Sequence, residues 1–270
     1  MSAIIPEPDA RELLALLFDK PRHWTSTSKD ELLQDADLRA ATDAASRLAS
    51  GMPMQYAARR AAFRHLTLYV DERVLIPRPE TEVLVDIVLE HSRASGGGVA
   101  ADVGTGSGAI AIALATEGRF DRVIATDVSV DALSVARRNA QAVAPTTPLE
   151  FRQGSLLGPV PERGLRAVVS NPPYISFDEA GALPALVRDW EPSVALFSPA
   201  DGMALTARLV REASRALGVG GLLALEVDVR RASLVAELVS ALGTYEDVRV
   251  ALDLTGRERF VVARRRETAG

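Results

Sequence analysis

The first sixty residues carry apolar side chains at helical spacing. Leu13, Leu14, Leu16 and Leu17 form a broad apolar stripe, as expected for a helix with one buried face. Ser28 with Glu31 three residues later is a capping-box pattern that predicts the start of a second helix. Gly51, followed by Pro53, predicts the end of a third helix. The pattern predicts a small helical domain with helices over residues 9–18, 28–38 and 38–50.

The apolar pattern changes from Phe63 onward. Apolar side chains between Phe63 and Ile76 alternate with polar ones, which predicts a β-hairpin that turns at Asp71-Glu72. Two prolines in residues 77–82 form a stiff linker into a helix over residues 82–92.

Beyond Gly96-Gly97-Gly98, β-type apolar runs alternate with helical patterns, which is typical of a parallel sheet covered on both faces. The last two runs, 248–252 and 260–263, are joined through Thr255-Gly256 and predict an antiparallel hairpin at one edge. We therefore expect an α/β fold with a doubly wound, mostly parallel seven-stranded sheet in residues 80–270, a hairpin and linker in 63–79 and a helical domain in 1–62. The other predicted strands are 99–103, 123–126, 149–152, 167–170 and 222–227, and the helices are 108–116, 131–142, 204–217 and 231–242.

Composition narrows the function classes. Of the 270 residues, 47% are hydrophobic, and 31 Lys and Arg stand against 36 Asp and Glu, a net charge of −5. The absence of Cys excludes disulfides, thiolate metal sites and a cysteine nucleophile, and the three His are too scattered to predict a metal site. With no signal-type stretch, no membrane-length apolar run and no basic face, we expect a cytoplasmic monomer that contacts neither membrane nor nucleic acid.

A glycine-rich loop follows the strand 99–103 and begins the next helix. It consists of Gly104, Thr105, Gly106, Ser107 and Gly108, in which glycines permit positive φ and close approach of a ligand to the backbone. Because residue 109 is Ala, the spacing is not that of a dinucleotide site; it resembles the first motif of class I S-adenosylmethionine-dependent methyltransferases. Asp127 ends the next strand, where a carboxylate can accept hydrogen bonds from ribose hydroxyls. The alternative is a structural turn in which Asp127 caps the following helix.

A second loop follows the strand 167–170, at the same predicted edge of the sheet. It consists of Asn171, Pro172, Pro173 and Tyr174. The prolines stiffen the loop. The Asn171 side-chain oxygen and the Pro172 carbonyl offer two acceptors, which match the two donors of a planar NH₂ group. The loop therefore predicts a site for an amide or aromatic amine, with Tyr174 packing on the substrate or, alternatively, only within the loop.

The two loops together resemble those of methyltransferases that act on planar nitrogens, and four further stretches narrow the resemblance. Taken with Asn-Pro-Pro-Tyr, they are similar to the release factor glutamine methyltransferase family, often called HemK, over residues 10–264. The stretches are Gly51-Met52-Pro53-Met54-Gln55-Tyr56, Leu75-Ile76-Pro77-Arg78-Pro79-Glu80-Thr81-Glu82, Trp190-Glu191-Pro192-Ser193-Val194-Ala195-Leu196-Phe197 and Asp253-Leu254-Thr255-Gly256-Arg257-Glu258-Arg259.

The resemblance implies a class I methyltransferase with a Rossmann-like sheet that transfers a methyl group from S-adenosylmethionine. The implied substrate is the Gln of the Gly-Gly-Gln tripeptide in class I peptide chain release factors, docked by the helical N-terminal domain. It also implies that residues 104–108 and Asp127 bind the cofactor, with Ser155 and Leu156 near adenine and Asn171 near the methionine end. Asn171, Pro172, Pro173 and Tyr174 would bind the substrate, with Asn171, Pro172 and Tyr174 in the catalytic roles.

Four positions depart from the family pattern. Ser155 stands in place of Asp, Arg59 in place of Gly, and Asp228 and Arg231 in place of the Gly and Gln of Glu-Ile-Gly-x-x-Gln. Three alternative hypotheses are a glutamine methyltransferase of a ribosomal protein, an adenine or guanine methyltransferase of nucleic acid, and a cofactor-binding scaffold without activity.

Overall fold

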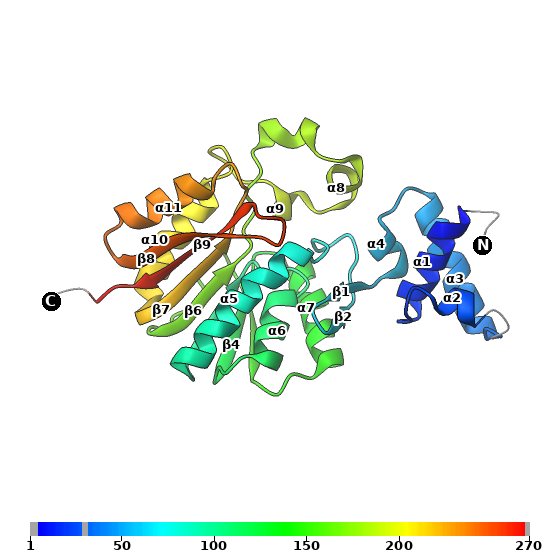
Figure 1. The fold of residues 1–270 in the computed structure, drawn as a ribbon, viewed down its shortest axis with the longest axis horizontal. Coiled ribbons are helices and arrows are strands. Elements are labelled where there is room, and N and C mark those ends of the chain that lie inside the picture. Colours follow the sequence, from blue (N-terminus) through cyan, green and yellow to red (C-terminus); the bar gives the residue numbers. More distant parts are fainter. Residues whose placement is uncertain (1–4, 29–31, 268–270) are drawn as a thin grey trace.

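The computed structural model describes residues 5–28 and 32–267. Helices and strands alternate through most of the chain, and their arrangement is drawn in Figure 1. The helices are α1 Glu7–Leu17, α2 Trp24–Thr27, α3 Asp35–Ala49, α4 Met54–Ala58, α5 Pro79–Ser95, α6 Ala109–Glu117, α7 Val130–Val143, α8 Ala185–Trp190, α9 Ser193–Leu196, α10 Ala204–Ala216 and α11 Ala232–Ala241, with a 3₁₀ turn at Phe177–Ala182. The strands are β1 Ala61–Phe63, β2 Leu66–Leu68, β3 Val99–Val103, β4 Arg122–Asp127, β5 Leu149–Gln153, β6 Leu165–Ser170, β7 Leu217–Glu226, β8 Tyr245–Leu252 and β9 Glu258–Arg265.

A seven-stranded sheet in the order β5-β4-β3-β6-β7-β9-β8 forms the centre of the larger part. The strands β3 to β7 run parallel, and β9 is antiparallel to both β7 and β8, so the predicted sheet and its edge hairpin are confirmed. Side chains alternate between the two faces along each strand. Ala100 packs under α5 and α6, whereas its neighbour Ala101 packs in the core with α10 and α11.

The chain order of the strands reverses between β3 and β6. From β3 the chain winds outward through β4 to β5, then returns to β6 on the other side of β3. In an open parallel sheet, the loops on either side of such a reversal separate and leave a crevice at the carboxyl ends of the strands. The glycine loop follows β3 and the Asn-Pro-Pro-Tyr loop follows β6, so both begin at this crevice.

The N-terminal helices form a separate apolar cluster, at the blue end of the ribbon in Figure 1. Leu13 of α1, Ala45 of α3 and Ala57 of α4 are buried together. The predicted helix 28–38 is wrong over residues 32–34: Ser28 closes α2, and the next helix begins only at Asp35, so residues 35–38 are helical as the start of α3. Leu32 is 94% exposed, so this stretch has no apolar face to bury against α1 or α3. Residues 29–31 of that prediction lie outside the described residues.

A hairpin lies in this region, but the predicted pairing across Asp71-Glu72 is wrong, since Val74 and Ile76 belong to no strand. β1 pairs with β2 through Phe63 and Leu66, so the chain turns at Arg64-His65 and not at Asp71-Glu72. Arg64 has a φ of 55°, and its guanidinium donates two hydrogen bonds of 2.8 Å to Glu117 of α6. The turn is therefore held by a contact distant in sequence. No helix within the described residues is long and apolar enough to cross a membrane.

Candidate active site

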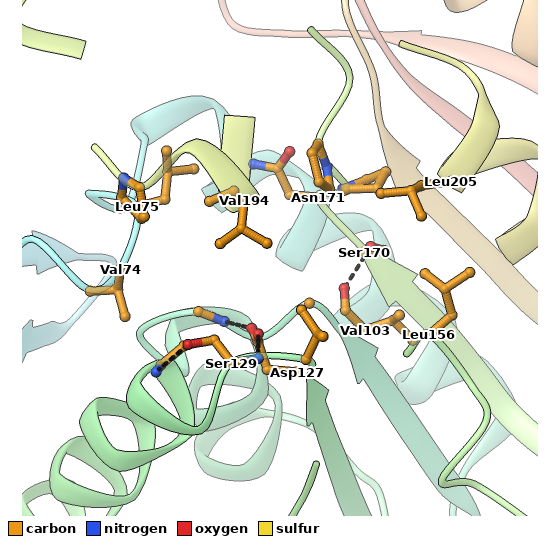
Figure 2. Close-up of a pocket in the computed structure, with 18 of the residues that line it drawn as sticks. Val74, Leu75, Val103, Asp127, Ser129, Leu156, Ser170, Asn171, Val194 and Leu205 are labelled. Carbon is orange, nitrogen blue, oxygen red and sulfur yellow. Dashed lines mark hydrogen bonds between the residues drawn. The ribbon is translucent and has the colours of Figure 1, made fainter. Parts of the chain in front are cut away.

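A large cavity lies at the crevice between β3 and β6. Figure 2 shows Asp127 on one side of it and Asn171 and Val194 on the other. About 840 Å³ of space free of protein atoms lies in it, a volume that includes the solvent at its open mouth. Most of its lining is apolar. The predicted site residues in that lining are Gly104, Gly106, Asp127, Ser155, Leu156, Asn171, Pro172 and Pro173.

The glycine loop presents open backbone to this cavity. Gly104 and Gly106 have φ values of 74° and 54°, and a Cβ added to either would meet no atom within 4 Å. Their glycine character therefore leaves space that a ligand can occupy. Gly108 differs: its Cβ would lie 3.1 Å from Ala136 and from Ile112, and Gly108 is outside the lining of the cavity. Glycine at 108 allows α6 to pack against α7.

A buried carboxylate anchors the glycine loop from behind. Asp102 Oδ2 accepts hydrogen bonds from the Thr105 hydroxyl at 2.6 Å and from the Ala111 amide at 3.0 Å. Burial raises the pKa of Asp102 to about 7. On the other side, Asn139 donates to the Ser107 carbonyl at 2.8 Å. The side chain of Thr105 thus serves the loop itself, and with Ser107 it lines a smaller cavity on the α5 side.

Asp127, at the end of β4, is fixed by two backbone amides. Its Oδ2 accepts from Gly106 N and its Oδ1 from Ser129 N, both at 2.9 Å (Figure 2). Each carboxylate oxygen has a second lone pair available for a ligand hydroxyl. The side chain that accepts at the N-terminus of α7 is Ser129, which caps Ala132 N, so Asp127 is not the helix cap.

The loop after β6, residues 171–174, which we call the substrate loop, is held against β3, the strand that precedes the glycine loop. The Ser170 hydroxyl donates to the Val103 carbonyl at 2.6 Å, and Asn171 follows directly. Asn171 and Pro172 line the large cavity and also a second one that includes Tyr174 and Arg78. Within the described residues, neither Asn171 Oδ1 nor the Pro172 carbonyl accepts a hydrogen bond. Both acceptors are therefore free for a substrate.

Tyr174 lines the second cavity and is absent from the lining of the large one. Burial raises the pKa of its phenol to about 12, so the phenol keeps its proton at neutral pH. A Cβ at Gly202 would come within 2.0 Å of the Tyr174 carbonyl. This close approach packs the chain before α10 on the substrate loop, and explains why residue 202 is glycine.

Several lining residues were missed by the sequence reasoning. Val194 and Ala195 of α9 line the cavity, as do Val74 and Leu75 of the segment before α5. Val194, Ala195 and Leu75 belong to stretches that carry the family resemblance, so those motifs were the signal that could have found them. Thr81, beside Asn171, also belongs to such a stretch.

Three of the four departures from the family pattern have side-chain partners. Arg59 ends α4 with a φ of 55°, a conformation that favours glycine, and its guanidinium contacts the Tyr69 hydroxyl. Arg231 donates to the Asp201 carbonyl at 2.6 Å and to Glu179 at 2.9 Å, and so links the start of α11 to the segment before α10 and to the 3₁₀ turn Phe177–Ala182. Asp228 accepts from Arg230 at 2.8 Å.

Comparisons with solved structures agree with the fold. A methyltransferase from Pyrococcus furiosus superposes with a TM-score of 0.58 at 20% identity, covering 76% of this chain and 92% of that one. A ribosomal protein L11 methylase from Lactobacillus delbrueckii subsp. bulgaricus gives 0.53 at 19% identity, covering 77% and 99%. Together with a match to the methyltransferase small domain, this fold defines a class I methyltransferase.

Sequence comparisons give the family. Residues 80–185 match the methyltransferase small domain and residues 3–57 the PrmC N-terminal domain. The release factor glutamine methyltransferase of Deinococcus radiodurans is 40% identical over 96% of this chain and 91% of its own length. That of Moorella thermoacetica is 38% identical, covering 97% and 92%. The chain belongs to the release factor glutamine methyltransferase family.

Proposed function

We propose that this protein transfers a methyl group from S-adenosylmethionine to the side-chain amide nitrogen (N5) of glutamine in the Gly-Gly-Gln motif of a class I peptide chain release factor. The observation that carries the proposal is the pair of free acceptors, Asn171 Oδ1 and the Pro172 carbonyl, at the wall shared by two cavities. One cavity can hold the cofactor while the amide enters through the other. The relatives are named release factor glutamine methyltransferases, which supports a release factor glutamine as the substrate.

The residues present fit S-adenosylmethionine. Gly104 and Gly106 leave room beside the backbone where a Cβ would otherwise project. Asp127 offers unused lone pairs to the ribose hydroxyls, and Leu156 offers an apolar side chain to the adenine. Ser155 lies beside it in the position where the family has Asp, so we expect a weaker polar contact to the base.

Catalysis would depend on positioning. The bound cofactor would supply an electrophilic methyl group on a sulfonium. An amide nitrogen is a weak nucleophile because its lone pair is delocalised, and the two acceptors on Asn171 and Pro172 would hold both amide hydrogens and favour the positive charge that develops on nitrogen. Tyr174 keeps its proton at neutral pH, so it packs beside the substrate and does not act as a base.

The N-terminal helices would dock the release factor. Their buried residues are apolar and small, and the part of this region that the structure describes contributes no side chain to the large cavity. Because the described residues of these helices do not line the large cavity, we assign them the docking of the release factor. The expected monomeric state and cytoplasmic location stay predictions.

Methyl transfer from labelled cofactor to purified release factor, ribosomes and nucleic acid tests the proposal directly. We expect label on the release factor, and none on a release factor in which the tripeptide Gln is replaced by Ala. Label on a ribosomal protein or on nucleic acid in place of the release factor would favour the corresponding alternative. Loss of all three labels with intact cofactor binding would favour an inactive scaffold.

A further inference from the structure

Asn171 is the last member of a hydrogen-bonded chain that runs into the core. Glu226, the final residue of β7, is 2% exposed. Its Oε2 accepts a hydrogen bond of 2.7 Å from the hydroxyl of Thr81, in the first turn of α5. The same hydroxyl oxygen accepts a longer bond of 3.4 Å from Asn171 Nδ2. Three distant parts of the sequence thus meet behind the substrate loop.

Counting hydrogens fixes the direction of this chain. An ionised carboxylate can only accept, so the single hydroxyl hydrogen of Thr81 is used on Glu226. The Thr81 oxygen then has only lone pairs to offer, and the Asn171 group that faces it must be the NH₂. The side-chain oxygen is consequently turned away from Thr81 and left free for the substrate amide.

We propose that Thr81 and Glu226 are positioning residues which set the orientation of the Asn171 amide, and that the ionised form of Glu226 selects the orientation in which Oδ1 faces the substrate. Its catalytic consequence rests on the proposed function, whereas the orientation itself does not. With Glu226 protonated, the carboxylic acid can donate to Thr81, and the Thr81 hydroxyl can then donate to Asn171 Oδ1. The amide would turn over, and its NH₂ would face the NH₂ of the substrate, donor against donor.

The surroundings of Glu226 allow both its ionised and its protonated form near neutral pH. Burial raises the pKa of Glu226 to about 7, against the opposing effects of Thr81 and of Arg259 on β9. Glu80 on α5 raises it further, and Arg78 lowers it. Tyr174 faces Glu226 as a neutral phenol. Ionisation of Glu226 should therefore change the orientation of Asn171 across the neutral range.

Steady-state kinetics on the full-length protein test the role of Thr81. Thr81→Val keeps the shape but removes the hydroxyl, so we expect kcat to fall about tenfold, the value of one hydrogen bond, with KM for the release factor within about twofold. Thr81→Ser should restore most of kcat. Glu90 is exposed on the same helix, so Glu90→Gln is the matched control and should leave kcat unchanged. A kcat for Thr81→Val within twofold of wild type would overturn the proposal.

The pH dependence tests the role of Glu226. We expect kcat of the wild type to rise with pH through about 7 and then level off, because the ionised form is the productive one. In Glu226→Gln, which keeps a neutral acceptor for Thr81, this rise should disappear. The same pH profile in both proteins would overturn the assignment.

A measurement without turnover separates this inference from the proposed function. In ¹⁵N NMR spectra, the Asn171 side-chain NH₂ signal can be identified by its loss in Asn171→Ala. We expect it to shift with pH with a midpoint near 7 in the wild type and to stay constant in Glu226→Gln. If it shifts while no release factor is methylated, the proposed function fails and the orientation stands; if it is constant in the wild type, the inference fails.

Discussion

Arg78 and Glu191 form an ion pair that joins the start of α5 to the segment between α8 and α9. The Glu191 side chain is 1% exposed, and Arg78 donates from Nη2 to its Oε1. Burial raises the pKa of Glu191 even though Arg78 opposes the shift. The two residues belong to separate stretches, 75–82 and 190–197, that carried the family resemblance. Their pairing explains how both stretches come to line one site.

Removing the Arg78 guanidinium from this ion pair should destabilise the folded protein. Arg78→Met leaves a buried carboxylate without a partner, so we expect the free energy of unfolding to fall by about 2–4 kcal/mol. Urea unfolding measures this. The double variant Arg78→Met, Glu191→Gln should recover most of the loss, and Arg188→Met, which breaks an exposed pair with Asp189, should change little. Equal losses in the single and double variants would contradict the explanation.

Asp127→Ala should weaken cofactor binding. The carboxylate would hold ribose hydroxyls and also holds Gly106 N, so we expect a loss of about 1–3 kcal/mol in calorimetry with S-adenosylmethionine. Asp131→Ala, at an exposed position in the first turn of α7, is the control and should bind normally. Binding of NAD by the wild-type protein would show that the cofactor is misassigned.

A shortened protein tests docking by the N-terminal helices. The cut should fall before α4, because the Tyr56 hydroxyl donates to the Val74 carbonyl and the side chain packs against α7. Without residues 1–52, we expect nearly intact cofactor binding and a collapse of methylation of folded release factor. Calorimetry and labelled transfer measure the two effects. Equal activity of the full and shortened proteins would rule out docking, and the calorimetric signal reports whether the shortened protein is folded.

The sheet and the two ligand loops could be predicted because their signals are local. Buried parallel strands such as β3 and β6 are continuous apolar runs, and the loops after them carry distinctive residues. The hairpin turn could not be placed, because Arg64 adopts a positive φ held by Glu117, 53 residues away. Thr81 and Glu226 were missed for a similar reason: only the fold brings α5 and the end of β7 to Asn171.

Asp102 should make stability depend on pH. Its pKa is raised by burial to about 7, whereas an unfolded Asp titrates near about 3.9. Between these values the folded protein holds a proton that the unfolded chain has released, so stability falls as pH rises from about 4 to 7, by up to about 1.4 kcal/mol per pH unit for one group. Glu226, raised to about 7 as well, acts in the same direction.

Asp102→Asn checks this directly. The amide keeps an acceptor for the Thr105 hydroxyl and the Ala111 amide but does not titrate. Urea unfolding at several pH values should show a shallower decline of stability for Asp102→Asn than for the wild type between about pH 4 and 7. Parallel curves would mean that Asp102 is ionised in the folded protein throughout this range.

Asn171→Ala should separate chemistry from cofactor binding. The substitution removes one acceptor for the substrate amide, worth about 1–3 kcal/mol, and the alignment for attack, worth roughly another 10²-fold in rate. Turnover with a release factor should therefore fall by on the order of 10³-fold. The glycine loop and Asp127 keep their own hydrogen bonds, so cofactor affinity should change by about tenfold at most.

Asn171→Asp tests the same position with a charge in place of the amide. It keeps an acceptor oxygen and adds a negative charge that would attract a sulfonium, so we expect retained or tighter cofactor binding together with poor turnover. Aspartate has no NH₂ group to donate to the Thr81 hydroxyl oxygen, so the side chain at position 171 loses its fixed orientation. Single-turnover methyl transfer, at saturating cofactor, measures the rate for both variants. Near wild-type transfer by Asn171→Ala would remove the basis for catalysis by positioning, because that mechanism assigns one of the two substrate amide hydrogens to Asn171 Oδ1.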